Sequence, residues 1–428
     1  MDAAGATALA AEGKDRSNMT RWSVSTHAIL ARTALAAVSL AFICGPTLAV
    51  QHLVAPGESW QDRAARMRPG DELILMPGKH KPGLIEILSG TPQLPITIRG
   101  VDAEHPAEII AEREGLRIRQ PRHVRIANMV ITGGSVAGIT LGSQAGNPES
   151  EVSDIEVRNV AIRRIGPKGQ RHGVALVGLN TVTVENVRVE GWGGSGIDVA
   201  ACRDVRLMHC SLKGLEEHSQ LYGIRVRTGS RQVQIEHCRF DQAGSIAVCL
   251  GGASSVEDFL PAVPTGAEPR SVAEASYVNV ENCFIIDAPC AVAYVSAAEC
   301  AVRRNTIVRP RRSVLAILSE SLDERISLGR NNIFGGNIVT WEAGDVKMYA
   351  EVSPKADTKS FSLETNLWWS PEPAEQRDKI VPTAADKPGV PVIPSGRNEG
   401  QVTQVDPKLD SKLTPTADAA QAFGAIPQ

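Results

Sequence analysis

The sequence has no strong excess of charge of one sign, no paired cysteine spacing and few aromatic residues. Lys and Arg number 45 against 48 Asp and Glu, so the chain lacks the basic excess that nucleic-acid binding requires. Its eight cysteines show no CxxC pair, which argues against a zinc site or a full disulfide framework. Aromatic residues make up only 4%, whereas 38 glycines and 26 prolines indicate frequent turns and many short strands.

An apolar run at residues 33–44 is too short to predict a membrane span. It follows Arg21 and Arg32 and precedes small residues that end at Ala49, which is typical of a cleaved signal peptide. Residues 1–49 are therefore predicted to be an upstream extension and a signal peptide. We expect a secreted, periplasmic or cell-envelope protein without a stable membrane anchor.

One octet recurs eight times, and such self-similarity is the signature of a repeat architecture. Its first, third and last residues are apolar, as in a strand with one face inward and a bend near its end. The starts of successive octets are 22 to 45 residues apart, which predicts one octet per coil of a solenoid, with insertions in the longer coils. The octets start at Val124, Ile155, Val182, Val205, Val233, Val278, Cys300 and Ile326.

The fifth and sixth positions of the octet repeat as residue types, which predicts ladders running from coil to coil. Stacked about 4.8 Å apart, amides can hydrogen-bond along the column, with His in place of Asn in two coils. Cysteines at the sixth position are expected to be small buried hydrophobes. The positions are Asn128, Asn159, Asn186, His209, His237 and Asn282 in the fifth column, and Cys210, Cys238 and Cys283 in the sixth.

A second strand precedes each octet and usually opens with Gly or Ser. Its β-branched and leucine side chains are expected inside, and Thr140, Ala175, Asp198, Arg225 and Ala247 outside. With a third short strand expected after each octet, the prediction is an all-β, single-stranded right-handed parallel β-helix.

The expected layout has four parts. Residues 1–49 come first, 50–110 form the N-terminal cap and first strands, 111–370 form the β-helix, and 371–428 form a Pro/Ala-rich tail. A short helix within residues 58–68, with Trp60, Ala64 and Met67 on one face, is expected to cap the solenoid.

The stretches 69–81, 95–100 and 115–131 resemble the start of the β-helix in the chondroitinase B and alginate lyase family. Residues 226–235 are similar to the segment that carries the family's catalytic arginine, which would fall on Arg227. The resemblance implies a pectin-lyase-like fold and β-elimination from a glycan that contains uronic acid.

The chain also departs from that family. The catalytic lysine would fall near Ala200, and the calcium-binding acidic residues near Gly193 and Ser195. None of these residues is of the type that the family has at that position. The resemblance therefore predicts the fold of this chain but not its mechanism. We expect no cofactor and no metal; calcium stays open as an alternative, although the expected ligand positions do not match.

Elimination requires a cation to neutralise the uronate, a base and an acid. Residues 155–240 contain 13 Lys and Arg but only 8 Asp and Glu, and this excess of positive charge favours an anionic ligand. Arginine is suited to neutralise the carboxylate, and His or Tyr is suited to transfer the proton. Trp can stack on the face of a sugar ring. The predicted catalytic residues are Arg227, Arg225, His172 and Tyr222, and the predicted substrate-binding residues are Asp198, Trp192, Lys168, Arg171 and His218.

Structural interpretations compete with these assignments. Arg225 and Arg227 could simply pair with Asp198 and Glu217, Trp192 could pack over a tight turn, and the two histidines could be surface residues. Two function classes therefore stay open: a monomeric lyase of acidic polysaccharide, and a non-catalytic β-helix that binds a glycan or another surface ligand. In the lyase, Arg227→Ala is expected to abolish turnover with little loss of stability.

Overall fold

The structure is a computed structural model that describes residues 49–102, 104–149, 151–321, 323–342, 344–377, 401–402 and 405–426. The chain divides at Leu48, and the described residues belong to the second of two units, Leu48–Gln428. All of the predicted signal peptide except Ala49 lies outside the described residues. None of the helices in the described part of the chain is long and apolar enough to cross a membrane.

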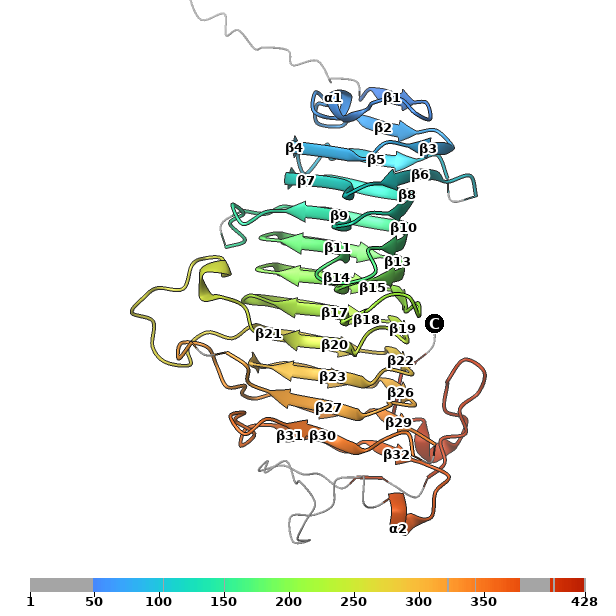
Figure 1. Ribbon diagram of the computed structural model, residues 1–428, viewed down its shortest axis with the longest axis vertical. Helices are drawn as coiled ribbons and strands as arrows, with labels where there is room; N and C mark the ends of the chain where they lie inside the picture. Colours follow the sequence, from blue (N-terminus) through green and yellow to red (C-terminus); the bar gives the residue numbers. More distant parts are fainter. Residues whose placement is uncertain are drawn as a thin grey trace, which may run out of the picture. The chain divides into compact units, whose positions relative to one another are not determined.

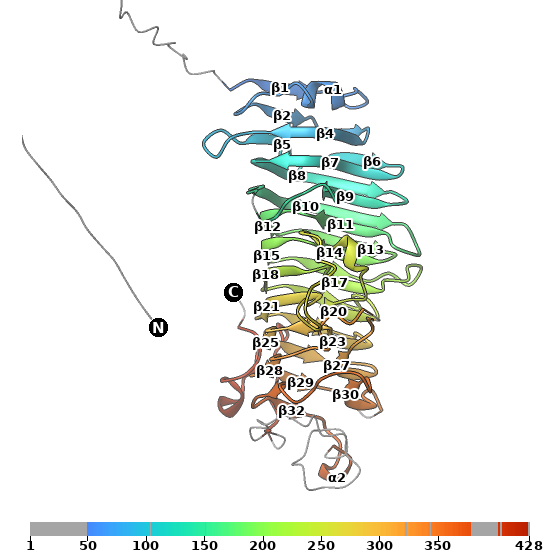
Figure 2. The same ribbon diagram turned by 90° about the vertical axis from the view of Figure 1, so that its left-hand side faces the viewer.

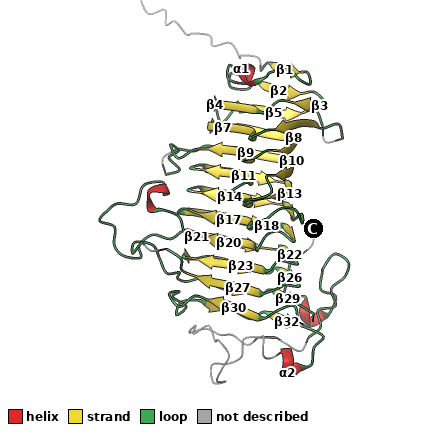
Figure 3. Ribbon diagram, in the orientation of Figure 1, coloured by secondary structure: helices red, strands yellow, loops and turns green. Residues whose placement is uncertain are grey.

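The second unit is a stack of coils in which each strand pairs in parallel with the strand of the next coil (Figure 1). The strands form a ten-stranded sheet and a 22-stranded sheet, joined by turns and by longer loops, among them the one between β20 and β21 (Figure 3). This is the predicted parallel β-helix. The ten-stranded sheet contains β4 (Gly83–Ser89), β7 (Glu114–Arg122), β9 (Ala137–Gly142), β11 (His172–Val177), β14 (Ser195–Ala200), β17 (Tyr222–Arg227), β20 (Ile246–Gly251), β23 (Cys290–Val295), β27 (Ser313–Leu318) and β30 (Met348–Val352).

The 22-stranded sheet has two arms, and two long strands, β8 (Val124–Gly133) and β10 (Ile155–Ile165), belong to both. One arm contains β1 (Gln51–Val54), β2 (Glu72–Leu75), β5 (Ile96–Gly100), β12 (Asn180–Glu185), β15 (Arg203–Met208), β18 (Ser230–Glu236), β21 (Ala275–Glu281), β24 (Ala297–Ala298), β25 (Ala301–Arg303), β28 (Ile333–Gly335) and β31 (Ser362–Leu363). The other contains β3 (Gly78–His80), β6 (Ala107–Ala111), β13 (Arg188–Trp192), β16 (Ser211–Lys213), β19 (Arg239–Asp241), β22 (Phe284–Ile286), β26 (Thr306–Val308), β29 (Ile338–Thr340) and β32 (Leu367–Trp369).

The octets bend at their fifth residue, which has a left-handed backbone conformation. Asn186, with φ 52°, lies between β12 and β13, so the third strand of the coil begins inside the octet and not after it. Asn tolerates this conformation better than most residues. The predicted ladder is confirmed: Asn186 Nδ2 donates to Asn159 Oδ1 (2.7 Å), and Asn159 Nδ2 donates to Asn128 Oδ1 (3.2 Å). The rings of His209 and His237 stack with centroids 5.3 Å apart.

The eighth octet was assigned in the wrong register. Ala301 pairs with Ile333, so the coil that follows Cys300 starts at Asn332, six residues later than Ile326. Buried amides, which the sequence reading missed, continue the cysteine column in these last coils. Asn305 Nδ2 donates to Asn337 Oδ1 (3.0 Å), and that oxygen also accepts from the Asn305 backbone N–H (2.9 Å). These bonds satisfy polar groups that burial would otherwise leave unpaired.

The inward positions carry the expected core. All seven described cysteines are free and buried. The capping helix is confirmed but shorter than expected: α1 covers only Gln61–Ala64, and Trp60 beside it is fully buried, its Nε1 donating to Lys81 O (3.0 Å). The other helical segments are η1 (Val256–Asp258), α2 (Ala374–Arg377) and η2 (Asp418–Ala420).

The glycines that open the strands of the ten-stranded sheet fit a tight corner. A Cβ on Gly173 would lie 2.5 Å from Gly196 O, so a side chain there would force the backbone to shift. In β20 Ala247 takes this corner and is fully buried, so its predicted outward position was wrong. In β20 the outward residue that pairs with Arg225 of β17 is Cys249 and not Ala247.

The end of the chain packs against the last coils. Val402 bridges to Leu367, and Gly424 N donates to Gly336 O (2.9 Å). Within the predicted Pro/Ala-rich tail, residues 378–400, 403–404 and 427–428 lie outside the described residues.

Candidate functional site

The parallel register gathers polar side chains on the outer face of β11, β14 and β17, which are neighbours in the stack (Figure 2). Asp198 pairs with Arg225, and Ser195 with Tyr222. Arg227 lies on the same strand as Arg225, two residues further on. Alternation along each strand therefore places Asp198, Arg225 and Arg227 on one face. Ser195 and Tyr222 open their strands and join the same cluster, because Ser195 Oγ donates to Asp198 and the guanidinium of Arg225 lies over the Tyr222 ring.

A buried ion pair forms the centre of the site. Asp198 is 2% exposed and accepts hydrogen bonds from Arg227 Nη2 (2.9 Å) and Nε (3.2 Å) and from Ser195 Oγ (3.2 Å). Burial raises the pKa of Asp198, but the charge of His172, when that ring is protonated in acid, and the permanent charge of Arg227 outweigh it and bring the pKa below the ordinary 3.8. Asp198 is therefore an ionised carboxylate whose main partner is Arg227.

His172 is arranged as a hydrogen-bond donor. Its Nδ1 accepts the backbone N–H of Ser195 (3.2 Å), so the neutral ring carries its proton on Nε2. Burial lowers the pKa of His172 below 6.5, and the charges of Arg227 and Arg225 lower it further, against the opposing effect of Asp198. At neutral pH the ring is uncharged and can offer Nε2–H to a ligand, which suits it poorly to the role of base.

Arg225 is the unpaired cation of the site. Its Cζ lies 4.6 Å from the ring centroid of Tyr222, and its Nε is buried without a hydrogen-bond partner. It forms no ion pair with any described residue, because Asp198 is bound by Arg227 and Glu217 pairs with Arg164 (3.0 Å). A Cβ on Gly252 would lie 2.6 Å from Arg225 Nη2, so that glycine leaves room for the guanidinium.

Tyr222 supplies a protonated phenol beside this cation. Burial raises its pKa, and the nearby charge of Arg225 offsets this only in part. The hydroxyl is therefore a proton donor at neutral pH.

The sequence reading missed a second carboxylate, Glu274, which is fully buried. It accepts hydrogen bonds from Thr228 N (2.9 Å) and Ser254 Oγ (2.8 Å), and Arg227 Nη1 donates to Thr228 Oγ1 (3.1 Å). Glu274 and Ser254 belong to the insertion that follows β20. No repeat signal could have placed them, because the insertion breaks the coil period.

Several predicted residues lie elsewhere. Trp192 was predicted to stack on a sugar, but it is fully buried and its Nε1 donates to Tyr222 O (2.7 Å), so it belongs to the core. The charges that act on His218 are those of Glu217 and Arg164, so it does not share the surroundings of His172. Lys168 is exposed in the loop after β10, and Arg171 contributes only its charge to the site.

The positions that the lyase resemblance singles out do not carry its chemistry. Ala200 pairs with Arg227, so the lysine position lies beside the arginine but has no amine. Gly193 and Ser195 bring no carboxylate, and the described residues contain no group of three or more His, Cys, Asp or Glu that could hold a metal ion. The site therefore does not fit the calcium ion that the family resemblance implies.

The ion pair also overturns one expectation. Arg227→Ala would leave Asp198 buried without its partner, which typically costs about 3–5 kcal/mol of stability. The substitution is therefore a poor test of catalysis by itself.

Fold and site together define a right-handed parallel β-helix protein with a polar cluster on one outer face. A family model described as "right handed beta helix region" matches residues 94–259. No curated protein sequence matches the chain significantly.

Among solved structures, the PL6 family alginate lyase AlyGC is 13% identical with a TM-score of 0.51, and the match covers 89% of this chain and 57% of that one. XylC in complex with xylose is 8% identical with a TM-score of 0.49, and 84% and 87% are covered. The PL6 polysaccharide lyase Pedsa3628 from Pseudopedobacter saltans is 10% identical with a TM-score of 0.44, and 87% and 99% are covered. At these identities the likeness concerns the fold alone.

Proposed function

We propose that this protein is exported and binds an acidic polysaccharide on the outer face of β11, β14 and β17. The observation that carries the proposal is Arg225, a half-buried guanidinium that has no carboxylate partner among the described residues. A uronate would supply two oxygens to its planar fork. Tyr222 and the Nε2–H of His172 add neutral donors beside it.

The binding test compares Arg225→Ala with Arg239→Ala. Arg239 is exposed in β19 of the other sheet, so the control removes the same charge from a different face. On affinity gels that contain alginate, chondroitin or pectate, Arg225→Ala should weaken binding of at least one polymer about tenfold, since hydrogen bonds to charged groups contribute roughly 1.5–3 kcal/mol. If both variants are retained equally, the polymer does not bind at Arg225. If the wild type is not retained by any of the three gels, the protein does not bind these acidic polysaccharides.

A β-eliminating lyase is the second candidate. It is favoured by the protonated phenol of Tyr222 next to a cation that could neutralise the uronate, an arrangement suited to protonating the leaving oxygen. It is opposed by Ala200 at the lysine position and by Nδ1 of His172, which is occupied by the Ser195 N–H. Elimination creates an unsaturated sugar that absorbs ultraviolet light.

The lyase is tested by recording that absorbance with the three polymers. Tyr222→Phe keeps the ring beneath Arg225 but loses the phenolic proton, so turnover should fall about 100-fold or more while binding is retained. If the wild type yields no unsaturated product but is retained on a gel, the protein binds without cleaving. Unchanged turnover in Tyr222→Phe would remove Tyr222 from the mechanism.

A further inference from the structure

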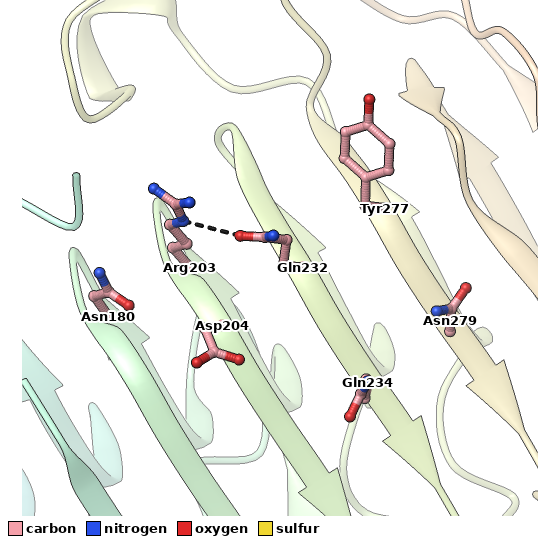
Figure 4. Close-up of a pocket in the computed structure, with 7 residues that line it drawn as sticks. All are labelled: Asn180, Arg203, Asp204, Gln232, Gln234, Tyr277 and Asn279. Carbon is pink, nitrogen blue, oxygen red and sulfur yellow. Dashed lines mark hydrogen bonds between the residues drawn. The ribbon is translucent and has the colours of Figure 1, made fainter. Parts of the chain in front are cut away.

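We propose that a second saccharide site, for an uncharged sugar chain, lies on the outer face of β12, β15, β18 and β21. These strands belong to the 22-stranded sheet, so the surface is distinct from the Arg225 site and the proposal does not rest on the function of that site. A hollow of about 660 Å³ lies over them (Figure 4). Its lining residues are Asn180, Arg203, Asp204, Gln232, Gln234, Tyr277 and Asn279.

Free amides line the floor of this hollow. Gln234 and Asn279 pair directly across β18 and β21, and Figure 4 shows their amides on these neighbouring strands. Both side chains are exposed and form no hydrogen bond with any described residue. Because an amide offers donors and an acceptor, a row of amides matches the alternating donor and acceptor character of sugar hydroxyls.

An aromatic side chain rises beside the amides without a packing role. Tyr277 is 58% exposed and has φ 53°, a conformation that is costly for a bulky residue. It borders both this hollow and a second one of about 290 Å³, which Phe259 and Pro261 help to line. An exposed ring with open space around it can stack on a sugar, because it combines an apolar face with a polar hydroxyl.

The charges around the hollow balance one another. Arg203 and Arg231 both pair with Glu149, and Arg203 Nε also donates to Gln232 Oε1 (2.9 Å). The carboxylate of Asp204, which accepts from Thr181 Oγ1 (3.3 Å), offsets the remaining positive charge. Among the residues that line the hollow, the guanidinium is that of Arg203, and it is bound by Glu149 and Gln232, in contrast to Arg225. Arg206, whose partner across the sheet is Gln234, is exposed on the same face but does not line the hollow.

The dimensions suit an oligosaccharide. Four neighbouring strands spaced about 4.8 Å apart span roughly 14 Å, which is longer than a single sugar ring. The ring of Tyr277 and the two amides lie within this span (Figure 4).

The test uses isothermal titration calorimetry of the full chain with cellohexaose, xylohexaose, mannohexaose and laminarihexaose. At least one of them should bind, and alginate should not displace it. Tyr277→Asn removes the ring but tolerates the left-handed backbone, and should weaken binding at least tenfold, whereas Tyr277→Phe should stay within threefold. Gln234→Ala combined with Asn279→Ala should also weaken binding, and Arg239→Ala is the matched surface control.

Three results would overturn the proposal. The first is that none of the four hexasaccharides binds at millimolar concentration. The second is wild-type affinity in folded Tyr277→Asn and in the double amide variant. The third is displacement of the bound hexasaccharide by alginate, which would place it at the other site.

Discussion

At the scale of single residues, His172 couples the site to pH. Its pKa in the folded protein lies below the ordinary 6.5, so below that pH the unfolded chain binds a proton that the folded chain does not. Stability should therefore fall as the pH drops from 6.5 towards the folded pKa. His172→Asn keeps an acceptor for the Ser195 N–H but cannot be protonated, and should remove this part of the pH dependence.

Urea unfolding at about pH 7.5 and pH 5 measures the effect. His105→Asn, which removes an exposed histidine, is the matched control. If the urea midpoint drops equally between the two pH values in the wild type and in His172→Asn, His172 does not couple stability to pH.

The direction of a side chain could be predicted where inward and outward residues alternate along a strand. It could not be predicted where the residue lies at a turn. Asp198 and Arg225 were placed outside correctly, because their strands have a clear inward pattern. Trp192 ends a strand before two glycines, and its indole turns back into the core to meet Tyr222 O. Glu274 lies far along the chain from Arg227, so only the folded insertion brings them together.

At the scale of elements, the left-handed corner between the two arms governs stability. Asn186→Ala loses the bond to Asn159 and replaces a residue that tolerates the left-handed conformation by one for which it costs about 1–2 kcal/mol. Asn186→Gly loses the same bond without that conformational cost. The urea midpoint should therefore drop more for Ala than for Gly, and the reverse order would show that the left-handed conformation costs Ala less than the extra backbone freedom costs Gly.

The coil register was predictable through seven octets because the fifth and sixth positions repeat in type. It failed after Cys300, where the column changes from cysteine to buried asparagine and two registers are possible, with either Asn331 or Asn337 in the sixth position. The hydrogen bonds from Asn305 and Asn337 to the adjoining coils select one of them.

At the scale of the whole molecule, the strands of each coil pair with those of the adjoining coils, so damage at one end should stay local. Trp60 is buried against the first coils, and Trp368 is buried in the last. Replacing either by Ala removes a large buried side chain, at a cost of about 3–5 kcal/mol.

Hydrogen exchange should therefore quicken in β2, β4 and β5 for Trp60→Ala, and in β28, β29 and β30 for Trp368→Ala. Each variant serves as the control for the other. Uniform acceleration along the chain in both variants would show that the solenoid unfolds as one cooperative unit.

The sequence by itself determined the coil, its inward residues and the asparagine corner, because these depend on local alternation and on a backbone conformation that few residues tolerate. Tertiary structure decided which polar side chains share a face. The pairing of Asp198 with Arg227, the unpaired state of Arg225 and the arrival of Glu274 depend on stacking distance and burial. So does the hollow beside Tyr277, since its amides and its ring come from different coils.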